Sequence, residues 1–396
     1  MSELKYWLWL SAADASANSK GALIARYGDA EAAFLAPAGE FASVPGVSRR
    51  DAEILESRDM SSSEYITEQC GIHHIDIISY QDAAYPGRLR NIYAPPAVLY
   101  VRGRLPRLDD SAAIAVVGTR RASRYGIKMA RSLSREIVDC GGIILSGLTD
   151  GVDGAAAAAA LAAGGICVGV LGTSHEEDRN ALSRDVAARG AVISEYPPGR
   201  KSQRGFFRER NRITAGLSVG VVAVEAPKKS GTALFVNEAA EQGKEIFAVP
   251  GNADSENSVG TIEFLKDGAK LVTCGWDVMS EFEWLYPDKI HRVKTEPRFA
   301  AQREETDSPL PKVPKKVIDK GNDRGYIDLK EQLKDLSEDQ LKIITAIDND
   351  ATHIDDIIEA TGLSTATVLA QLTFLEIKGY VRREAGRRIS LNTAKK

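Results

Sequence analysis

The sequence has little cysteine and no long apolar segment, and these two shortages exclude broad classes of protein. Its four cysteines lie far apart and form no CxxC pair, which argues against a structural zinc site and a secreted disulfide scaffold. No apolar run approaches the ~20 residues that a membrane-spanning helix needs, and the first residues include no basic leader. We therefore expect a soluble, cytoplasmic protein that has no membrane partner and binds no metal.

The chain also lacks an excess of positive charge. With 51 basic and 55 acidic residues among 396, its formal net charge is -4, so the protein as a whole does not attract a polyanion. Any nucleic-acid function must therefore come from a local basic surface. The length predicts two or three domains, and a hydrophobic content of 43% supplies enough material for their cores.

Two common nucleotide-binding motifs are missing from the turn where an α/β protein would carry one. Residues 114–117 have the pattern of a buried strand and lead into Gly118, Thr119, Arg120 and Arg121. A dinucleotide site would need GxGxxG there, and a P-loop would need GxxxxGK[ST]. The N–H groups that begin the next helix, together with the arginines, favour a phosphodiester backbone, unless the turn is merely tight and its arginines solvated. No cofactor is expected.

Short β-branched segments alternate with helical segments from residue 114 to about residue 273. Strands are expected at residues 114–117, 143–145, 167–171, 191–193, 219–224, 246–249 and 270–272. The alanine run Ala155–Ala160 predicts a closely packed helix, because alanine is the best helix former. Apolar strands of this kind are typical of a parallel sheet covered on both faces. The chain is therefore predicted to adopt an α/β fold with a Rossmann-like, doubly wound, mostly parallel sheet.

Changes in pattern divide the chain into four parts. Residues 1–70 read as a small helical domain, in which Val44–Ser48 has the character of a helix-hairpin-helix or SAM-like turn. Such a turn offers N–H groups to a DNA phosphate, but for so short a match we favour a purely structural hairpin. Residues 71–289 form the Rossmann-like domain with its N-terminal extension, residues 290–335 a linker with prolines and lysines, and residues 336–396 a further domain.

Three helices followed by a short hairpin predict a winged-helix fold for this last part. A capping box at Ser337–Gln340 opens the first helix, residues 354–360 form the second, and residues 365–378 form the third. The arginine-rich segment 381–391 forms the hairpin. The first half of the third helix carries no basic residue, so a protein-binding role is about as well supported as DNA recognition.

Three further segments place candidate ligands at one edge of the sheet. The turns at Ser146–Gly147 and Ser230–Gly231 both follow strands, and parallel strands end at the same edge. Residues 200–212 hold six basic residues, one glutamate and two adjacent phenylalanines. Basic groups contact phosphate while an aromatic face stacks on an unpaired base, although Phe206 or Phe207 could instead plug the core. The predicted DNA-binding residues are Gly118, Thr119, Arg120, Arg121, Ser146, Gly147, Arg204, Phe207, Arg210, Asn211, Arg212, Ser230 and Gly231.

A series of short motifs between residues 85 and 269 resembles the DNA-processing protein A (DprA/Smf) family. In order, they are Tyr85–Pro86, Ala94–Gly103, Val116–Arg120, Ser146–Gly147, Gly151–Asp153, Ser194–Pro197, Arg210–Ile213, Val224–Ala226, Ser230–Thr232, Ala248–Gly251 and Asp267–Ala269. The resemblance implies a protein that binds and protects incoming single-stranded DNA in natural transformation and loads the RecA recombinase onto it. It also implies a homodimer formed through the Rossmann-like domain and no enzymatic reaction. Carried over by position, it implies that Arg120, Ser146–Gly147, Phe207 and Arg210–Arg212 line the DNA groove.

The sequence departs from the family pattern at four places. Ala157 stands where the family usually has histidine, and the loop Ser174–Asn180 is acidic and lacks the usual Tyr-Pro. Arg208 replaces a proline after the groove phenylalanine, and Leu234–Phe235 interrupts a stretch of small residues. The acidic loop puts in doubt any contact that the family makes there.

Two other functions remain open. A nucleotide-hydrolysing Rossmann enzyme of the lysine-decarboxylase-like group would share the glycine-rich turns, but its motif PGGxGTxxE ends in a glutamate where this chain has Phe235. Glu225 has no histidine, cysteine or serine near it in a recognisable nucleophile arrangement, so no catalytic machinery is visible. An adaptor that acts through the winged helix alone is the third interpretation.

Overall fold

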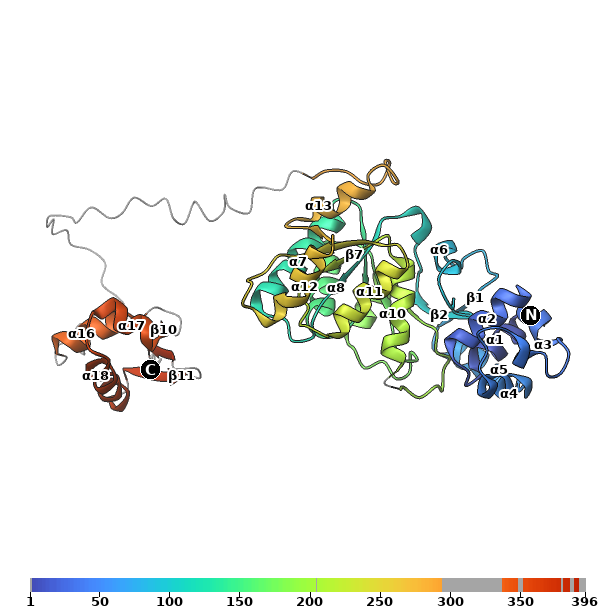
Figure 1. Cartoon of the computed structure of the whole chain (residues 1–396), viewed down its shortest axis with the longest axis horizontal. Coiled ribbons are helices and arrows are strands. Elements are labelled where there is room, and N and C mark those ends of the chain that lie inside the picture. Colours follow the sequence, from blue (N-terminus) through green and yellow to red (C-terminus); the bar gives the residue numbers. More distant parts are fainter. Residues whose placement is uncertain are drawn as a thin grey trace. The chain divides into compact units, whose positions relative to one another are not determined.

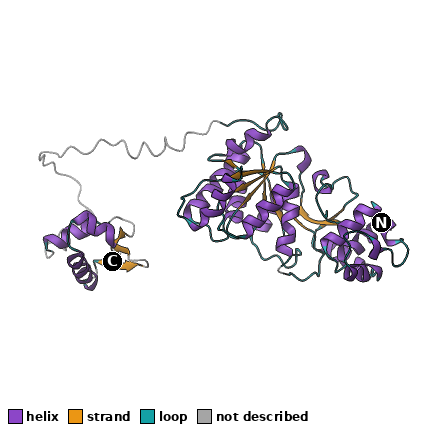
Figure 2. Cartoon of the chain, in the orientation of Figure 1, coloured by secondary structure: helices purple, strands orange, loops and turns teal. Residues whose placement is uncertain are grey.

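The computed structural model describes residues 2–203, 205–293, 337–347, 352–378, 380–384 and 388–391 (Figures 1 and 2). The chain divides into two compact units, residues 1–296 and residues 297–396. The first unit contains a bundle of short helices and a large sheet covered by helices, and the second combines helices with a small sheet. None of the described helices is long and apolar enough to cross a membrane. The predicted linker lies almost wholly outside the described residues.

Five helices form the amino-terminal part of the first unit. They are α1 (Ser2–Ala12), α2 (Ala17–Tyr27), α3 (Ala30–Phe34), α4 (Arg49–Glu56) and α5 (Ser62–Ile72). Their core is aromatic, and the Trp9 ring meets the Phe34 ring edge-on with 5.1 Å between centroids. Tyr100 of the sheet is buried in the same core, so these helices are joined to the sheet by packing as well as by the chain.

The hairpin turn at residues 44–48 is held by the protein's own side chains. The Ser48 N–H donates to Ser19 Oγ at 3.3 Å, and the Ser19 hydroxyl donates to the Asp51 carboxylate at 2.7 Å. Burial opposes ionisation of Asp51, but hydrogen bonds from the surrounding serines outweigh it and lower the pKa of this carboxyl. Because the turn and the neighbouring helix ends already surround an internal carboxylate, the structure favours the structural interpretation of the hairpin.

Nine strands form one sheet in the order β1-β2-β6-β5-β4-β3-β7-β8-β9. They are β1 (Asp76–Ser79), β2 (Val98–Gly103), β3 (Ala113–Val117), β4 (Ile143–Ser146), β5 (Cys167–Val170), β6 (Ala191–Ser194), β7 (Gly220–Ala223), β8 (Glu245–Ala248) and β9 (Lys270–Leu271). Neighbouring strands from β6 to β9 in this order run parallel, while β2 pairs antiparallel with β6 and β1 with β2. The predicted Rossmann-like, mostly parallel sheet is confirmed. The two antiparallel strands fall in the segment predicted only as an extension.

The strand order reverses beside β3. From β3 the chain builds outward through β4, β5 and β6, and it then returns to the other side of β3 at β7. Val117 at the end of β3 therefore lies opposite Ala223 at the end of β7. Loops that leave these two strand ends diverge to opposite sides, and such a switch point is where open α/β sheets bind ligands.

Helices cover both faces of the sheet. On one face lie α7 (Arg124–Asp139), α8 (Val152–Ala162) and α9 (Leu182–Arg189), and on the other lie α10 (Phe206–Leu217) and α11 (Gly231–Glu241). The remaining helices of this unit are α6 (Gly87–Arg90), α12 (Val259–Lys266) and α13 (Gly275–Met279). The alanine run lies in α8, where Ala156, Ala157 and Ala160 are fully buried. Small side chains thus allow the close helix packing that the alanine run predicts.

The second unit has the predicted winged-helix pattern. Its described helices are α16 (Glu338–Thr345), α17 (Ile354–Thr361) and α18 (Thr365–Ile377). The described strands β10 (Thr352–His353), β11 (Val381–Glu384) and β12 (Arg388–Leu391) pair in the order β10-β12-β11. The capping box is present, because Ser337 Oγ accepts from the Gln340 N–H and the Gln340 side chain accepts from the Ser337 N–H. Ile343, Leu372 and Val381 meet in its core.

Gly151 and Gly164 offer a matched test of how closely the strand-end turns must approach each other. Both have positive φ, but a Cβ at Gly151 would overlap the Thr119 carbonyl oxygen, whereas a Cβ at Gly164 would meet nothing within 4 Å. We expect Gly164→Ala to cost about 1–2 kcal/mol of backbone strain. Gly151→Ala should cost roughly 1–3 kcal/mol more, because of the overlap and because its ψ of -129° lies outside the left-handed helical region. Calorimetric unfolding measures both, and equal losses would mean that the turns separate without cost.

Candidate nucleic-acid interface

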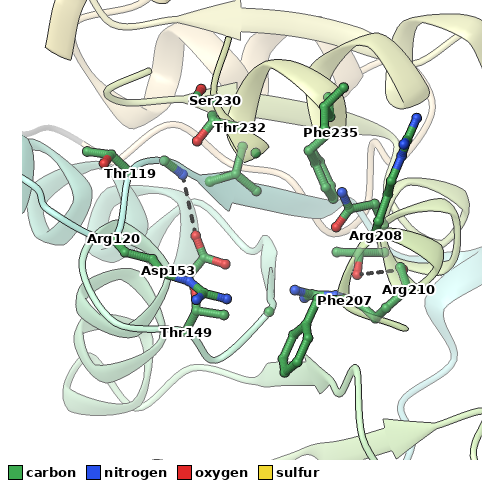
Figure 3. Close-up of a pocket in the computed structure, with 17 residues that line it drawn as sticks. Thr119, Arg120, Thr149, Asp153, Phe207, Arg208, Arg210, Ser230, Thr232 and Phe235 are labelled. Carbon is green, nitrogen blue, oxygen red and sulfur yellow. Dashed lines mark hydrogen bonds between the residues drawn. The ribbon is translucent and has the colours of Figure 1, made fainter. Parts of the chain in front are cut away.

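A pocket of about 390 Å³ opens at the carboxyl ends of β3, β4 and β7, where the strand order reverses (Figure 3). The first residues of α8, α10 and α11 also reach it. Helix N-termini present unpaired N–H groups and a partial positive charge, so their convergence favours an anion. The lining residues are Val117, Gly118, Thr119, Arg120, Gly147, Thr149, Asp153, Phe207, Arg208, Arg210, Asn211, Thr214, Ser230, Gly231, Thr232, Leu234 and Phe235.

Helix α10 supplies one wall of the pocket, through one face and the adjoining Arg208. Phe207, Arg210, Asn211 and Thr214 follow the i, i+3, i+4, i+7 spacing of one helix side. Phe206 points elsewhere, because it is 7% exposed and stacks on Tyr196 with 3.9 Å between centroids. The structure therefore distinguishes the two adjacent phenylalanines. Phe206 fills the interior, and Phe207 lies in the pocket.

Arg120 and Phe207 meet across the mouth of the pocket. The Phe207 ring is 38% exposed, and the Arg120 guanidinium carbon lies 5.7 Å from its centroid. At this separation a guanidinium is attracted to the negative face of an aromatic ring. A cation and an exposed aromatic ring are thus held side by side, although their positions differ by 87 in the sequence.

Arg210 places a buried positive charge at the floor of the pocket. Its Nη1 donates to the Val170 carbonyl at 3.1 Å, while its Nε has no hydrogen-bond partner among the described residues. Gly147 leaves room for this guanidinium, since a Cβ there would overlap it. Burial lowers the pKa of Arg210, and the neighbouring carboxylate of Asp153 opposes that shift. An entering anion would therefore find a poorly solvated cation.

Asp153 balances this charge from the start of α8. Its Oδ1 accepts from the Gly118 N–H at 3.4 Å, which joins the turn after β3 to α8. Burial raises the pKa of Asp153, while Arg210 and the backbone N–H groups of Gly118 and Gly147 lower it. The two charges are close enough to affect each other's pKa, yet they form no direct ion pair within 4.0 Å among the described contacts. The floor of the pocket consequently keeps hydrogen-bonding capacity for a ligand.

The comparisons with known proteins agree with this architecture. The model of the DNA recombination-mediator protein A family matches residues 76–283, and the model of the DprA winged helix domain matches residues 329–387. The chain belongs to the DprA/Smf family. Protein Smf of Synechocystis sp. is 32% identical over 317 residues, which cover 78% of each chain, and DNA processing protein DprA of Bacillus subtilis is 39% identical over 53% of this chain and 71% of its own. The crystal structure of DprA from Streptococcus pneumoniae superposes with a TM-score of 0.61 at 30% identity and covers 70% of this chain and 98% of that one.

Most residues that the DprA/Smf resemblance and the sequence pattern selected are brought together. The predicted residues that line the pocket are Gly118, Thr119, Arg120, Gly147, Phe207, Arg210, Asn211, Ser230 and Gly231. Ser146 lies beneath it, where its hydroxyl donates to the Asp153 carbonyl at 3.0 Å. Arg121 is exposed outside the lining, and Arg204 lies outside the described residues.

Arg212 is the predicted DNA contact that the structure places elsewhere. It is buried and forms a two-pronged ion pair with Glu195, with N–O distances of 3.0 and 2.6 Å, and its Nε donates to the Ala94 carbonyl at 3.0 Å. Burial alone would lower the pKa of Arg212, but Glu195 outweighs it and raises that pKa. Its guanidinium N–H groups are therefore used in contacts within the protein. Its position five residues after Phe207 turns it away from the pocket face of α10.

Several lining residues were not selected from the sequence. They are Val117, Thr149, Asp153, Arg208, Thr214, Thr232, Leu234 and Phe235. Helical spacing from Phe207 would have found Thr214 and rejected Arg212, because the face repeats every three to four residues. Asp153 gave no signal of its own, since its role depends on the distant Arg210.

Two residues at this edge of the sheet bear on whether the site could catalyse hydrolysis. Glu225 is buried, and its carboxylate accepts from the Ser123 N–H at 2.9 Å, from the Ser123 hydroxyl and from Asn257 Nδ2 at 3.2 Å. A serine therefore does lie beside Glu225, but its hydroxyl accepts from the Gly126 N–H and caps the start of α7. Phe235 stands in the pocket wall where the hydrolase motif would have glutamate. Among the described ranges, no group of three or more histidine, cysteine or acidic residues is placed to hold a metal ion.

The acidic loop in which this chain departs from the family is anchored to the fold. His175 is buried with its Nε2 2.9 Å from the Tyr100 carbonyl, and burial lowers the pKa of this imidazole to about 4. Glu176 accepts from the Gly199 N–H at 2.8 Å in the loop that leads to α10. The Glu176 carboxylate of the acidic loop therefore helps to hold the loop that leads to α10.

The Arg212–Glu195 pair yields a prediction that separates stability from binding. Arg212→Met should lower the free energy of unfolding by about 3–5 kcal/mol, because it leaves the largely buried Glu195 charge without its partner. The double variant Arg212→Met/Glu195→Gln should recover part of that loss. Thermal unfolding measures both variants. An Arg212→Met variant with an unchanged melting temperature and weakened DNA binding would instead show that Arg212 contacts DNA.

Proposed function

We propose that this protein binds single-stranded DNA in the pocket at the carboxyl edge of its sheet. The observation that carries the proposal is the contact of Arg120 with the exposed Phe207 ring above the buried Arg210. Unpaired bases expose their faces for stacking, whereas those of a duplex are covered by their neighbours. A stacking ring beside phosphate-binding cations thus favours single strands over duplexes.

Each part of the pocket has a distinct role in this proposal. Arg120 and Arg208 meet phosphates at the mouth, and the first N–H groups of α11 after Ser230 donate to a further phosphate oxygen. Phe207 stacks on one base, and Arg210 attracts the strand from the floor. None of these contacts reads a base edge, so little sequence preference is expected.

The wider role follows from membership of the DprA/Smf family. We propose that the protein protects incoming single-stranded DNA during natural transformation, loads the RecA recombinase onto it, and forms a homodimer through the Rossmann-like domain. We propose that it catalyses no reaction. The occupied carboxylate of Glu225 and the placement of Phe235 support binding over the hydrolase alternative.

We also propose the four-part organisation stated above, with DNA binding confined to the sheet domain. Residues 1–70 would support α10, residues 71–289 would hold the DNA, residues 290–335 would link, and residues 336–396 would form an accessory winged helix. The location of all pocket residues between Val117 and Phe235 supports this assignment.

Binding to oligonucleotides tests the function. The protein should prefer single-stranded DNA to a duplex of equal length, and neutralising roughly five phosphates should give a slope of log K against log salt near -3.5. A chain that ends at residue 293 should retain this slope. Fluorescence anisotropy at several salt concentrations measures it. A preference for duplex, or an affinity independent of salt, would sink the proposal.

The contact between Arg120 and Phe207 should make their contributions non-additive. Arg120→Ala should reduce the salt slope by roughly 0.7, since one phosphate contact is lost. Phe207→Ala should cost about 1–3 kcal/mol of stacking and leave that slope unchanged. Because the side chains touch, the double variant should differ from the sum of the two losses by more than roughly 0.5 kcal/mol.

The matched control for this cycle is Arg121→Ala. It removes the same charge from the neighbouring position, but that side chain is exposed outside the pocket lining. Its loss of affinity should be smaller than that of Arg120→Ala. Equal losses for the two arginines, with strict additivity of Arg120 and Phe207, would show that charge alone binds the DNA.

A further inference from the structure

Helix α7 carries a row of basic residues along its outer side. Arg124, Lys128, Arg131 and Arg135 are all exposed and follow the spacing i, i+4, i+7, i+11, which places them on one face. The row extends over about 17 Å of helix axis at 1.5 Å per residue. The opposite face, with Ala130 and other apolar residues, is buried against α8 and the sheet.

Three of the four charges of this row are not neutralised by the described residues. Arg124, Lys128 and Arg131 have no ion-pair or hydrogen-bond partner for their side chains in the described part of the chain, and only Arg135 pairs, with Asp139 at 3.7 Å. Glu136 does not compensate them, since its carboxylate accepts from the Ser132 hydroxyl at 2.8 Å and from the Gly275 N–H at 2.7 Å.

Such an arrangement is unfavourable in an isolated helix. Like charges three or four residues apart destabilise a helix by roughly 0.2–0.5 kcal/mol per pair, whereas solvated faces commonly alternate acids with bases. A run of three unpaired cations is therefore unexpected in a chain whose net charge is -4. A bound polyanion would turn this repulsion into attraction.

The row is continuous with the proposed DNA pocket. Helix α7 begins three residues after Arg121, and Arg120 lies in the pocket wall. The helix then runs away from the carboxyl edge beside α8 (Figure 1). A strand that leaves the pocket past Arg120 would thus meet Arg124 and then the rest of the row.

We propose that the row formed by Arg124, Lys128 and Arg131 is a second contact for the sugar-phosphate backbone of the single strand held in the pocket. The inference rests on the proposed function, because the pocket fixes where the strand begins. The charged side chains point to phosphates rather than bases. The row therefore lengthens the bound segment without adding sequence preference.

The length of the DNA separates this contact from the pocket. The triple variant Arg124→Gln/Lys128→Gln/Arg131→Gln should bind a thymidine oligonucleotide just long enough for the pocket as the wild type does. On an oligonucleotide several times longer, its salt slope should fall by roughly 2, because three phosphate contacts are lost. Glutamine preserves length and helix propensity, and unchanged thermal unfolding verifies that the variant is folded.

The matched control is Arg104→Gln/Arg107→Gln/Lys266→Gln. It removes three exposed cations at the opposite, amino edge of the parallel strands and changes the net charge equally. It should retain the wild-type slope on the long oligonucleotide. Equal slopes for both triple variants, or a loss from the row that is the same on short and long DNA, would overturn the second contact. If the wild type bound neither oligonucleotide, the proposed pocket itself would fail, which is a different result.

Discussion

The buried guanidinium of Arg210 is the group on which the candidate site depends. It reaches from α10 under the turn at Gly147, donates to the carbonyl of Val170 at the end of β5, and lies near Asp153 at the start of α8. Three segments are thereby held around one charge. Because a charge is costly to bury without compensation, Asp153 and the backbone groups must stay close to it, and the pocket keeps its shape. Its Nε has no hydrogen-bond partner among the described residues, and Arg210 is one of the residues that line the pocket.

Helix α10 lines the pocket with one face and packs with another against the segment that follows β6. Phe207 and Arg210 line the pocket, while Phe206 stacks on Tyr196 and Arg212 pairs with Glu195. The loop before α10 is tied to the helical domain, since Arg200 forms an ion pair with Asp14. The helical domain therefore helps to set the position of α10. The helical domain can therefore contribute to DNA binding without contacting DNA itself. The Asp51 carboxylate, which the hairpin of this domain already surrounds, agrees with this interpretation.

Local concentration of charge explains how an acidic chain can bind a polyanion. Cations gather at the pocket mouth and along the outer side of α7. The acids near them have hydrogen-bond partners within the protein: Glu225 accepts from the Ser123 N–H, and Glu136 accepts from the Gly275 N–H. The acids of the remaining surface keep the net charge at -4. Attraction by these cations acts over about a Debye length at physiological salt, so it is local to this edge of the sheet and the adjoining helix.

The sequence by itself determined the mostly parallel sheet, the winged-helix pattern and the family, because strand periodicity, capping residues and short motifs are local signals. It also indicated the turns at Gly118, Gly147 and Ser230, since every parallel strand ends at the same edge. Only the tertiary structure decided which side chains of one basic segment face that edge. Arg210 and Arg212 are two residues apart and chemically identical, yet one lies under the pocket and the other is bound to Glu195. A helix turns about 100° per residue, so neighbours in sequence face different surroundings, and those surroundings come from strands far away in the chain.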